Sequence, residues 1–421
     1  MENFCEDPPQ RRPFNMADLL KSPDKIAYMN KYDRITIGRY DYIFEGDRFL
    51  LNPYEFRVFA SKCDNLIVWG YPLMEYACKN NDLSMVKCLA ENGINTHNIG
   101  NACCTTMRHI GLASANGDEA IPLVNFLIEN STCTWCANYF DPRMHEACKN
   151  GNGSLKIVSF LIEKGANVNE VVGGETPLIS ACESAHDSLE LVELLIKNGA
   201  DVNHLDSYGL SPLFYACKKG DEAIALVELL MKNGANPNLD KWRYRHFPMI
   251  YFPIQAACVY KGAKLIKYLV ENGADVCVAN RILLIEIICK KYNVDESLEL
   301  IKYLVDHGLD VNSYGYNRRY PINAVCELGD SALPLVKYLA SVGADLNCVD
   351  NDGERPIHYA CRQGRRAIKI IKFLIGQRVD VGAASRYGRT PSSLTYDVEI
   401  RLLLAAERLS QFVINLRNSS P

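Results

Sequence analysis

The residues of this chain that could carry chemistry are first of all its cysteines, which recur at nearly equal spacing. The sequence has 421 residues and 17 cysteines. One position of a pattern that recurs about every 35 residues is occupied by Cys78, Ser114, Cys148, Cys182, Cys217, Cys258, Cys289, Cys326 and Cys361. Thiols at regular spacing are candidate zinc ligands or candidate disulfide partners. Which chemistry applies depends on the elements that hold them.

Each repeat of the pattern predicts a first helix, a turn, a second helix and an extended hairpin, which we call a finger. The second helix is clearest in LELVELLIKNGADVN, where Leu189 and Val192 lie at helical spacing and Gly199 ends the helix in a left-handed conformation. The first helix follows a Thr-Pro pair at Thr176, a capping residue before a proline. A pattern that persists over about three quarters of the chain indicates a solenoid.

The segment TPLISACESAHDSLELVELLIKNGADVN, which begins at Thr176, resembles an ankyrin repeat, and His145 and His358 stand at the family's usual histidine position. The resemblance covers about nine repeats, and most are about two residues longer than is usual in the family. It implies an all-α solenoid of stacked helix-turn-helix repeats with extended hairpin fingers. It also implies a scaffold that binds proteins.

The predicted stack favours packing over chemistry for the recurring cysteines. The resembled family has a small residue, often alanine, at this position between neighbouring first helices. Packed helices lie about 8–10 Å apart, whereas a disulfide needs Cα atoms within about 7 Å. One sulfur per repeat also cannot supply the four convergent ligands of a zinc site. We therefore expect these thiols to be small core residues.

A second group of thiols is a weaker metal candidate. Cys133 and Cys136 form a C-x-x-C pair on one finger, and Cys103 and Cys104 lie on the preceding finger. Adjacent fingers could bring the four together, but a Cys-Cys pair is poor ligand spacing and a single C-x-x-C is a weak signal. We favour apolar filling of a degenerate repeat, and we expect no metal and no cofactor.

The sequence predicts three regions. Residues 1–68 do not follow the repeat and are expected to form an N-terminal arm and cap, with one or two helical turns in residues 16–32; the alternative is that this arm docks on a partner. Residues 69–392 form the array, degenerate at 100–135 and 275–315. Residues 393–421 form a C-terminal cap helix and tail, because a solenoid end needs a cap.

No catalytic motif is recognisable, so we expect a protein that is not an enzyme. His145 and His358 are expected to be structural residues of first helices. The formal net charge of −4 disfavours a nucleic-acid binder. No apolar run is long enough to span a membrane. The first residues lack an apolar signal-peptide core, so we expect a reducing, cytoplasmic location, with attachment to the cytoskeleton as an alternative.

Binding residues are expected on the later fingers, which carry aromatic and basic residues although the chain is acidic overall. Tryptophan, tyrosine and arginine are enriched where interfaces bind tightly. The candidates are Trp242, Arg243, Tyr244, Arg245, His246, Tyr316, Arg318, Arg319, Tyr320, Arg386, Tyr387 and Arg389. The competing interpretation is a solvated face with aromatic rings packed beneath it.

The function expected from these residues is a scaffold or adaptor that binds a protein partner, one with an acidic surface, through the concave surface of fingers and first helices. One alternative is a structural component of a large assembly, such as a cytoskeletal one, anchored by the N-terminal arm. The other is contact with RNA or single-stranded nucleic acid through the basic and aromatic fingers.

Overall fold

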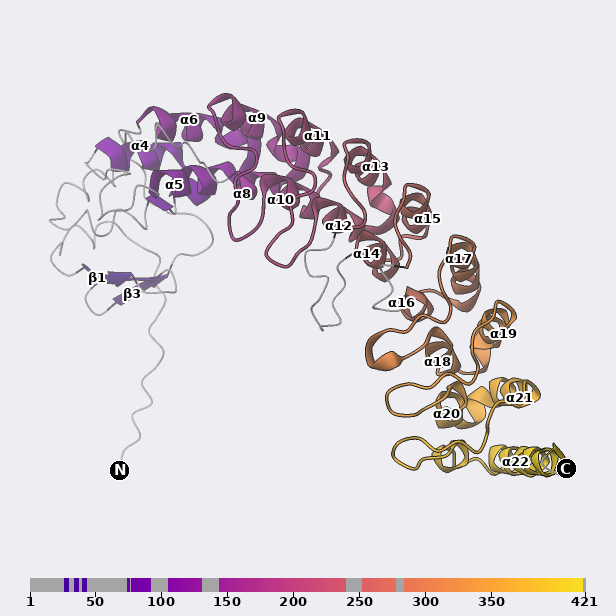
Figure 1. The fold of residues 1–421 in the computed structure, drawn as a ribbon. Helices are drawn as coiled ribbons and strands as arrows, with labels where there is room; N and C mark the ends of the chain where they lie inside the picture. Colours follow the sequence, from indigo (N-terminus) through magenta and orange to yellow (C-terminus); the bar gives the residue numbers. More distant parts are fainter. Residues whose placement is uncertain are drawn as a thin grey trace, which may run out of the picture. The chain divides into compact units, whose positions relative to one another are not determined.

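The structure is a computed structural model that describes residues 26–29, 34–37, 40–43, 74–75, 77–91, 105–130, 144–239, 252–277 and 284–418. The chain divides into two compact units, an N-terminal unit of residues 1–201 and a C-terminal unit of residues 202–421. Both units contain short helices stacked in pairs (Figure 1).

The N-terminal unit contains a small sheet and the first helix pairs. The strands β1 (Ile26–Met29), β2 (Arg34–Ile37) and β3 (Tyr40–Ile43) form an antiparallel sheet in that order. The helical turns expected in residues 16–32 are therefore wrong for residues 26–29. Pairing with β2 satisfies backbone groups that an isolated helical turn would leave unpaired.

The helices of the N-terminal unit alternate between first and second helices of the repeats. They are α4 (Leu83–Glu91), α5 (Thr105–Ser114), η2 (Gly117–Ala120), α6 (Ile121–Glu129), α8 (His145–Cys148), η3 (Gly151–Ser154), α9 (Leu155–Glu163), α10 (Pro177–Glu183) and α11 (Leu189–Lys197). The first helices α5, α8 and α10 pack on one another, and each also packs on the second helix that follows it.

The C-terminal unit repeats this arrangement. Its helices are α12 (Pro212–Cys217), η4 (Gly220–Ala223), α13 (Ile224–Lys232), α14 (Pro253–Val259), α15 (Ala263–Glu271), α16 (Leu284–Lys291), α17 (Val294–Asp306), η6 (Tyr316–Arg318), α18 (Pro321–Cys326), η7 (Asp330–Ala332), α19 (Leu333–Ser341), α20 (Pro356–Arg362), η8 (Gly364–Ala367), α21 (Ile368–Gly376), η9 (Pro391–Leu394) and α22 (Val398–Asn418). The first helices from α12 to α20 form one row, and α17, α19, α21 and α22 pack successively beside it. The predicted all-α repeat array is thus confirmed, with the small sheet preceding it.

The expected local signals set the helix ends. The Thr176 hydroxyl accepts the N–H of Ile179 at 3.3 Å, and the Ser211 hydroxyl accepts the N–H of Phe214 at 3.2 Å. Each satisfies a donor that the first turn of a helix leaves unpaired. Gly199 follows α11 with φ of +88°, a conformation that is unfavourable for residues with a Cβ and readily adopted by glycine.

Asparagines join successive repeats of the C-terminal unit through two hydrogen bonds each. The Asn203 side chain donates to the carbonyl of Gly234 at 2.9 Å and accepts the N–H of Asn236 at 2.8 Å. Asn238 and Asn312 make the same pair of bonds to the repeats that follow them. At the equivalent position between them stands Cys277, whose thiol donates to the carbonyl of Gly308 at 3.1 Å.

The recurring cysteines are core residues, as predicted. All eight are free thiols; Cys289 is partly exposed and the other seven are buried. Burial raises the pKa of Cys78 to about 12, with a smaller effect from Glu75, so the thiol stays protonated and a poor nucleophile. Ser114 occupies the same position in its repeat and donates to the carbonyl of Ile110 at 2.7 Å. Cys103, Cys104, Cys133 and Cys136 lie outside the described residues.

No helix in the described ranges is both long and apolar enough to cross a membrane.

Candidate binding site in the C-terminal fingers

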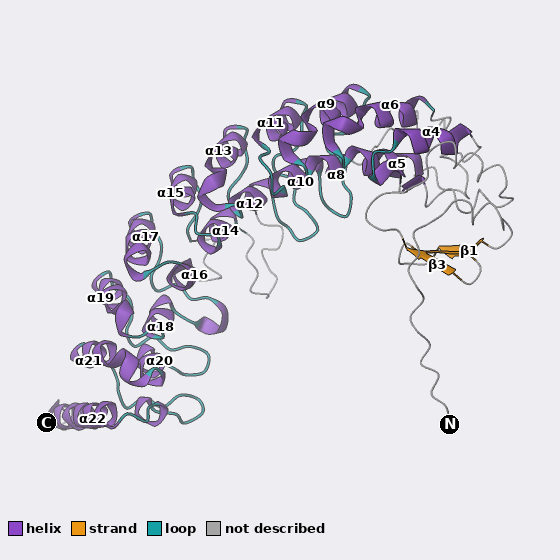
Figure 2. Cartoon of the chain, turned by 180° about the vertical axis from the view of Figure 1, so that it is seen from behind, coloured by secondary structure: helices purple, strands orange, loops and turns teal. Residues whose placement is uncertain are grey.

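Three consecutive fingers of the C-terminal unit, residues 309–320, 344–355 and 379–390, bring most of the described candidate residues into one row. We call them the C-terminal fingers. Each leads from a second helix, α17, α19 or α21, to the next first-helix position. Figure 2 shows that they project from the row of α18 and α20, away from the second helices.

The middle finger, 344–355, is built around a buried carboxylate. Asp350 Oδ1 accepts the N–H groups of Asp352 at 2.9 Å and Glu354 at 2.8 Å. Its Oδ2 accepts the hydroxyl of Tyr359, on α20, at 2.6 Å. Gly353 completes the turn with φ of +76°, and a Cβ there would lie 2.8 Å from the backbone nitrogen of Arg386. The carboxylate thus fixes both the turn and its position on the first helix.

The same bonding occurs in the finger before α12. Asp206 Oδ1 accepts the N–H groups of Tyr208 and Leu210, both at 2.8 Å, and its Oδ2 accepts the Tyr215 hydroxyl at 2.7 Å. Gly209 stands at the left-handed position, with φ of +80°. A carboxylate, a glycine and a first-helix tyrosine therefore form one structural unit in two separate repeats.

The finger 309–320 departs from this pattern at all three positions. Gly315 stands where the carboxylate would be, and Ala324 replaces the tyrosine of the first helix. Arg318 occupies the glycine position and keeps the left-handed conformation, with φ of +56°; Asn317 before it has φ of +58°. A left-handed residue other than glycine costs about 1–2 kcal/mol, so this finger holds an arginine at its tip at the expense of backbone stability.

Backbone hydrogen bonds join the three tips. The N–H of Asn351 donates to the carbonyl of Asn317 at 3.0 Å, and the N–H of Arg386 donates to the carbonyl of Asp352 at 2.8 Å. These bonds fix the spacing of the fingers, so the side chains at the tips form a preorganised row.

A histidine below the tips links the second and third of these fingers. His358 Nδ1 accepts the N–H of Arg355 at 3.1 Å, so the proton is on Nε2, which donates to the carbonyl of Arg389 at 3.2 Å. Burial lowers the pKa of His358, although the Arg389 carbonyl opposes the shift. The neutral imidazole therefore acts as a structural bridge.

Exposed tyrosine and arginine side chains pair on the outer two fingers. Tyr314 is 56% exposed, and the Arg318 guanidinium lies 5.5 Å from its ring centre. Tyr387 is 66% exposed, and the Arg389 guanidinium lies 5.0 Å from its ring centre. Between them the Asp352 carboxylate accepts the Tyr387 hydroxyl at 3.4 Å. The tips thus present basic and aromatic groups on both sides of an acidic one.

Deeper in the same face, arginines are paired within the chain. Arg319 contacts Glu327 in an ion pair and lies 3.9 Å from Glu286. Burial alone would lower the pKa of Arg319, but the two glutamates more than offset this, so the pKa lies above its ordinary value. Arg319 and Arg362 each lie with the guanidinium 5.2 Å from the Tyr359 ring centre. These arginines stabilise the base of the fingers, and their charge is partly neutralised.

The structure thus separates the candidate residues into groups. Arg318, Arg386, Tyr387 and Arg389 are exposed on the tips, while Arg319 and Tyr320 are partly buried below them. The side chain of Tyr316 lies outside what the structure describes, as do all of Trp242, Arg243, Tyr244, Arg245 and His246. Tyr314 and Asp352 belong to the same surface and were not among the candidates; their only sequence signal is their position on fingers.

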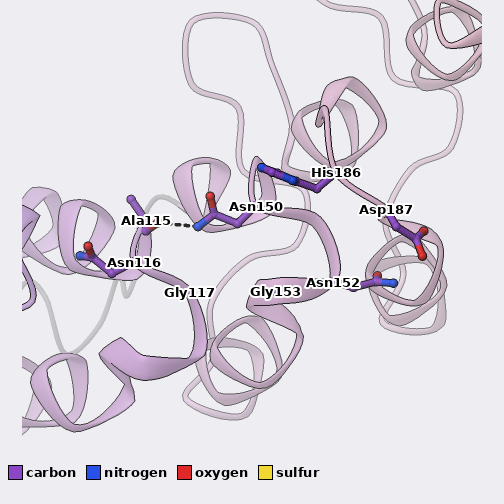
Figure 3. Close-up of a pocket in the computed structure, with 8 residues that line it drawn as sticks. All are labelled: Ala115, Asn116, Gly117, Asn150, Asn152, Gly153, His186 and Asp187. Atoms are coloured by element: carbon purple, nitrogen blue, oxygen red, sulfur yellow. Dashed lines mark hydrogen bonds between the residues drawn. The ribbon is translucent and has the colours of Figure 1, made fainter.

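A separate cavity in the N-terminal unit lies between the turns that join first and second helices. It has a volume of about 600 Å³ and is lined by Ala115, Asn116, Gly117, Asn150, Asn152, Gly153, His186 and Asp187 (Figure 3). Asn150 donates to the carbonyl of Ala115, and Asn152 Oδ1 accepts the N–H of Leu191 at 3.1 Å. The lining contains no serine, cysteine or lysine nucleophile, and its asparagines hold the turns together.

Within the part of the chain that the structure describes, no group of three or more histidine, cysteine, aspartate or glutamate side chains is arranged to hold a metal ion. A family model described as ankyrin repeats, in three copies, matches residues 110–206, 144–241, 184–280 and 285–385. No curated protein matches the chain. Repeats of this family generally mediate protein–protein interactions.

Proposed function

Because this chain belongs to the ankyrin-repeat family, we propose that it is a non-catalytic adaptor whose C-terminal fingers bind an extended protein segment bearing acidic residues. We also propose that the protein works in a reducing compartment such as the cytoplasm, because the recurring buried cysteines are free thiols. The alternative of an assembly component anchored by residues 1–68 depends on a region in which only three short strands are described.

The observation that carries the proposal is the left-handed backbone of Arg318. Two other fingers have Gly209 and Gly353 at this position, and glycine adopts the conformation without steric cost. Retention of a strained arginine at an exposed tip supports a binding role, because backbone strain is concentrated at functional sites. The adjacent Tyr314 ring orients the guanidinium and adds apolar contact area.

The spacing of the fingers defines the ligand. Arg318 and Arg386 are two repeats apart, about 16–20 Å at the usual distance between packed helices. An extended segment rises about 3.3 Å per residue, so carboxylates about six residues apart would reach both arginines. Asp352 lies between them and favours a hydrogen-bond donor at the centre of the segment.

The alternating charge favours a protein over a nucleic acid. A phosphate backbone is negative throughout and would meet Asp352 between the two basic tips. A peptide can place acidic groups at its ends and a neutral or basic group in the middle, which complements the order of charges on the fingers.

The test uses two fluorescein-labelled peptides of about twelve residues that share one composition, one with glutamates six residues apart and one with the same glutamates adjacent. Fluorescence anisotropy with the full chain should give tighter binding of the first. Arg318→Gly should raise its Kd about fivefold, the size expected for loss of one exposed charged contact, and should stabilise the fold.

Arg378→Gly is the matched control, because Arg378 is also exposed and left-handed, with φ of +59°, but it lies between α21 and the start of the last finger rather than at a finger tip. It should give a similar gain in stability with unchanged Kd. Equal binding of the two peptides, or an equal change of Kd in both variants, would exclude the tip arginines as the binding site.

A further inference from the structure

The last helix, α22, exposes an apolar stripe. The side chains of Val398, Leu402, Leu409 and Phe412 are between 61% and 68% exposed. Exposed apolar residues of this size are ordinary when scattered, but a continuous set on one helix indicates an interaction surface.

The stripe lies on a different face from the one that packs on the array. Ile400 and Leu404 are buried against it, and the Gln411 side chain donates to the carbonyl of Val379 at 2.8 Å. α22 has 21 residues, against nine in α19 and in α21 before it. It is the last element of the stack and contacts α21 and η9 (Figure 1).

Preceding second helices present charged residues to solvent instead. Lys369 and Lys372 are exposed on α21, and Lys337 is exposed on α19. Capping the array needs only the inner face of α22 together with a polar outer face. The apolar outer face is therefore not explained by closure of the solenoid.

The spacing of the stripe identifies the shape of what covers it. Val398, Leu402, Ala405, Leu409 and Phe412 are separated alternately by four and three residues, and Ala405 is exposed too. This is the spacing of the a and d positions of a coiled coil, in which each side chain inserts between four residues of a facing helix. A loop or a strand would not match a seam of this period.

The flanking residues identify the charge of the partner. In the heptad register with Leu402 and Leu409 at a, the g positions are Arg401 and Arg408, both exposed. Arg401 Nε donates to the carbonyl of Thr395 at 2.8 Å, which leaves its positive charge unpaired by a carboxylate in that bond. The e position of the first turn, Glu399, is engaged by Lys372 at 3.0 Å. The border of the seam available to a partner is thus basic on one side.

A second copy of α22 fits this border poorly. In an antiparallel pair the g positions face one another, so Arg401 and Arg408 would repel their equivalents. In a parallel pair they would face e positions occupied by Ala406 and Val413, which offer no carboxylate.

We propose that the exposed seam of α22 docks an amphipathic helix of another protein, with apolar a and d residues and acidic residues at its flanking positions. This surface is separate from the fingers, so the chain would hold two different partners, an extended acidic segment and an acidic helix.

The test uses two labelled synthetic peptides of the length of α22, with leucine at every a and d position and either glutamate or lysine at every e and g position. Anisotropy with the full chain should give a Kd for the glutamate peptide about tenfold lower than for the lysine peptide. Leu402→Glu with Leu409→Glu should abolish this binding. Arg408→Glu should shift the preference towards the lysine peptide.

Three variants control for added charge, for the fingers and for folding. Ser410→Glu places the same charge on an exposed position of α22 outside the seam and should leave Kd unchanged, as should Arg318→Gly. The seam variants should unfold like the wild type in denaturant, whereas Leu404→Glu, at a buried position, should not.

Three results would overturn the proposal. Equal binding of the two peptides would remove the charge selection. Failure of both to bind a monomeric chain would remove the docking site. A dimer in light scattering that Leu402→Glu with Leu409→Glu dissociates would make a second copy the occupant.

Discussion

The fingers 344–355 and 309–320 belong to successive repeats, and different residues form the turn at the tip of each. The first uses Asp350, Gly353 and Tyr359 to satisfy its backbone and fix it to α20. The second has Gly315, Arg318 and Ala324 at the same three positions and a left-handed arginine at its tip. The comparison separates residues that hold a finger in shape from residues that a finger exposes at its tip. Each prediction below substitutes a residue that differs between fingers or repeats and measures the effect on stability.

The largest effect is expected from Asp350→Ala. The substitution leaves two backbone N–H groups and the Tyr359 hydroxyl without their acceptor, and each buried unpaired group costs about 1–3 kcal/mol. Because the turn can relax towards water, we expect a loss of about 3 kcal/mol in the free energy of unfolding, measured with urea.

Asp350→Asn is the control for this prediction, because the amide oxygen can still accept both turn bonds. It should cost clearly less than the alanine substitution. If Asp350→Ala costs no more than Asp350→Asn, the carboxylate does not hold the finger.

A smaller loss is expected when the left-handed glycines of neighbouring fingers are replaced by alanine. At Gly353 a Cβ would meet the Arg386 nitrogen at 2.8 Å, whereas at Gly388, with φ of +71°, nothing lies within 4 Å. Gly388→Ala should cost about 1 kcal/mol from the backbone conformation alone, and Gly353→Ala should cost more by the energy of the clash. Equal denaturation midpoints would show that the tips are not held at the distance described.

The smallest effect concerns the histidine position of the first helices, which holds His358 in one repeat and Asn323 in the preceding one. Because burial lowers the pKa of His358 below its ordinary 6.5, the folded chain binds fewer protons there than the unfolded chain. This contribution to stability is complete above pH 6.5 and is lost as the pH falls through the lowered pKa.

His358→Asn should therefore flatten the pH dependence of the free energy of unfolding, measured with urea, below pH 6.5. His109 should still contribute to the pH dependence of stability in this variant, since burial, helped by Arg108, lowers its pKa to about 4. An unchanged slope in the variant would mean that His358 does not titrate differently on folding.

Much of the array could be predicted from sequence because its signals are local. The Thr-Pro pair at Thr176, the glycine at Gly199 and the small residue at Cys182 act within one or two turns of helix. The role of Arg318 could not be predicted in the same way. Its position can be aligned with a glycine, but only the fold shows that the arginine keeps the glycine's backbone conformation.

Side-chain partners from different repeats were also beyond the sequence. Arg319 and Arg318 are neighbours in the chain and looked equivalent, yet Arg319 turns back to Glu286 and Glu327 while Arg318 stays at the tip. The difference arises because α16 and the end of α18 supply the carboxylates of Glu286 and Glu327 next to Arg319, below the finger tips. Strand β1 was missed for a related reason. Its pairing partner, β2, lies outside residues 16–32, the segment that was expected to form helical turns.

Among the described hydrogen bonds that join successive repeats of the C-terminal unit, the weakest is the one made by Cys277. Where Asn203, Asn238 and Asn312 each supply a donor and an acceptor, Cys277 supplies a thiol, a weak donor and a weaker acceptor. In a linear array stability is a sum of nearest-neighbour terms. We therefore expect a pulling force along the C-terminal unit to open it first between α15 and α17, while the fingers beyond that joint remain folded together with α22.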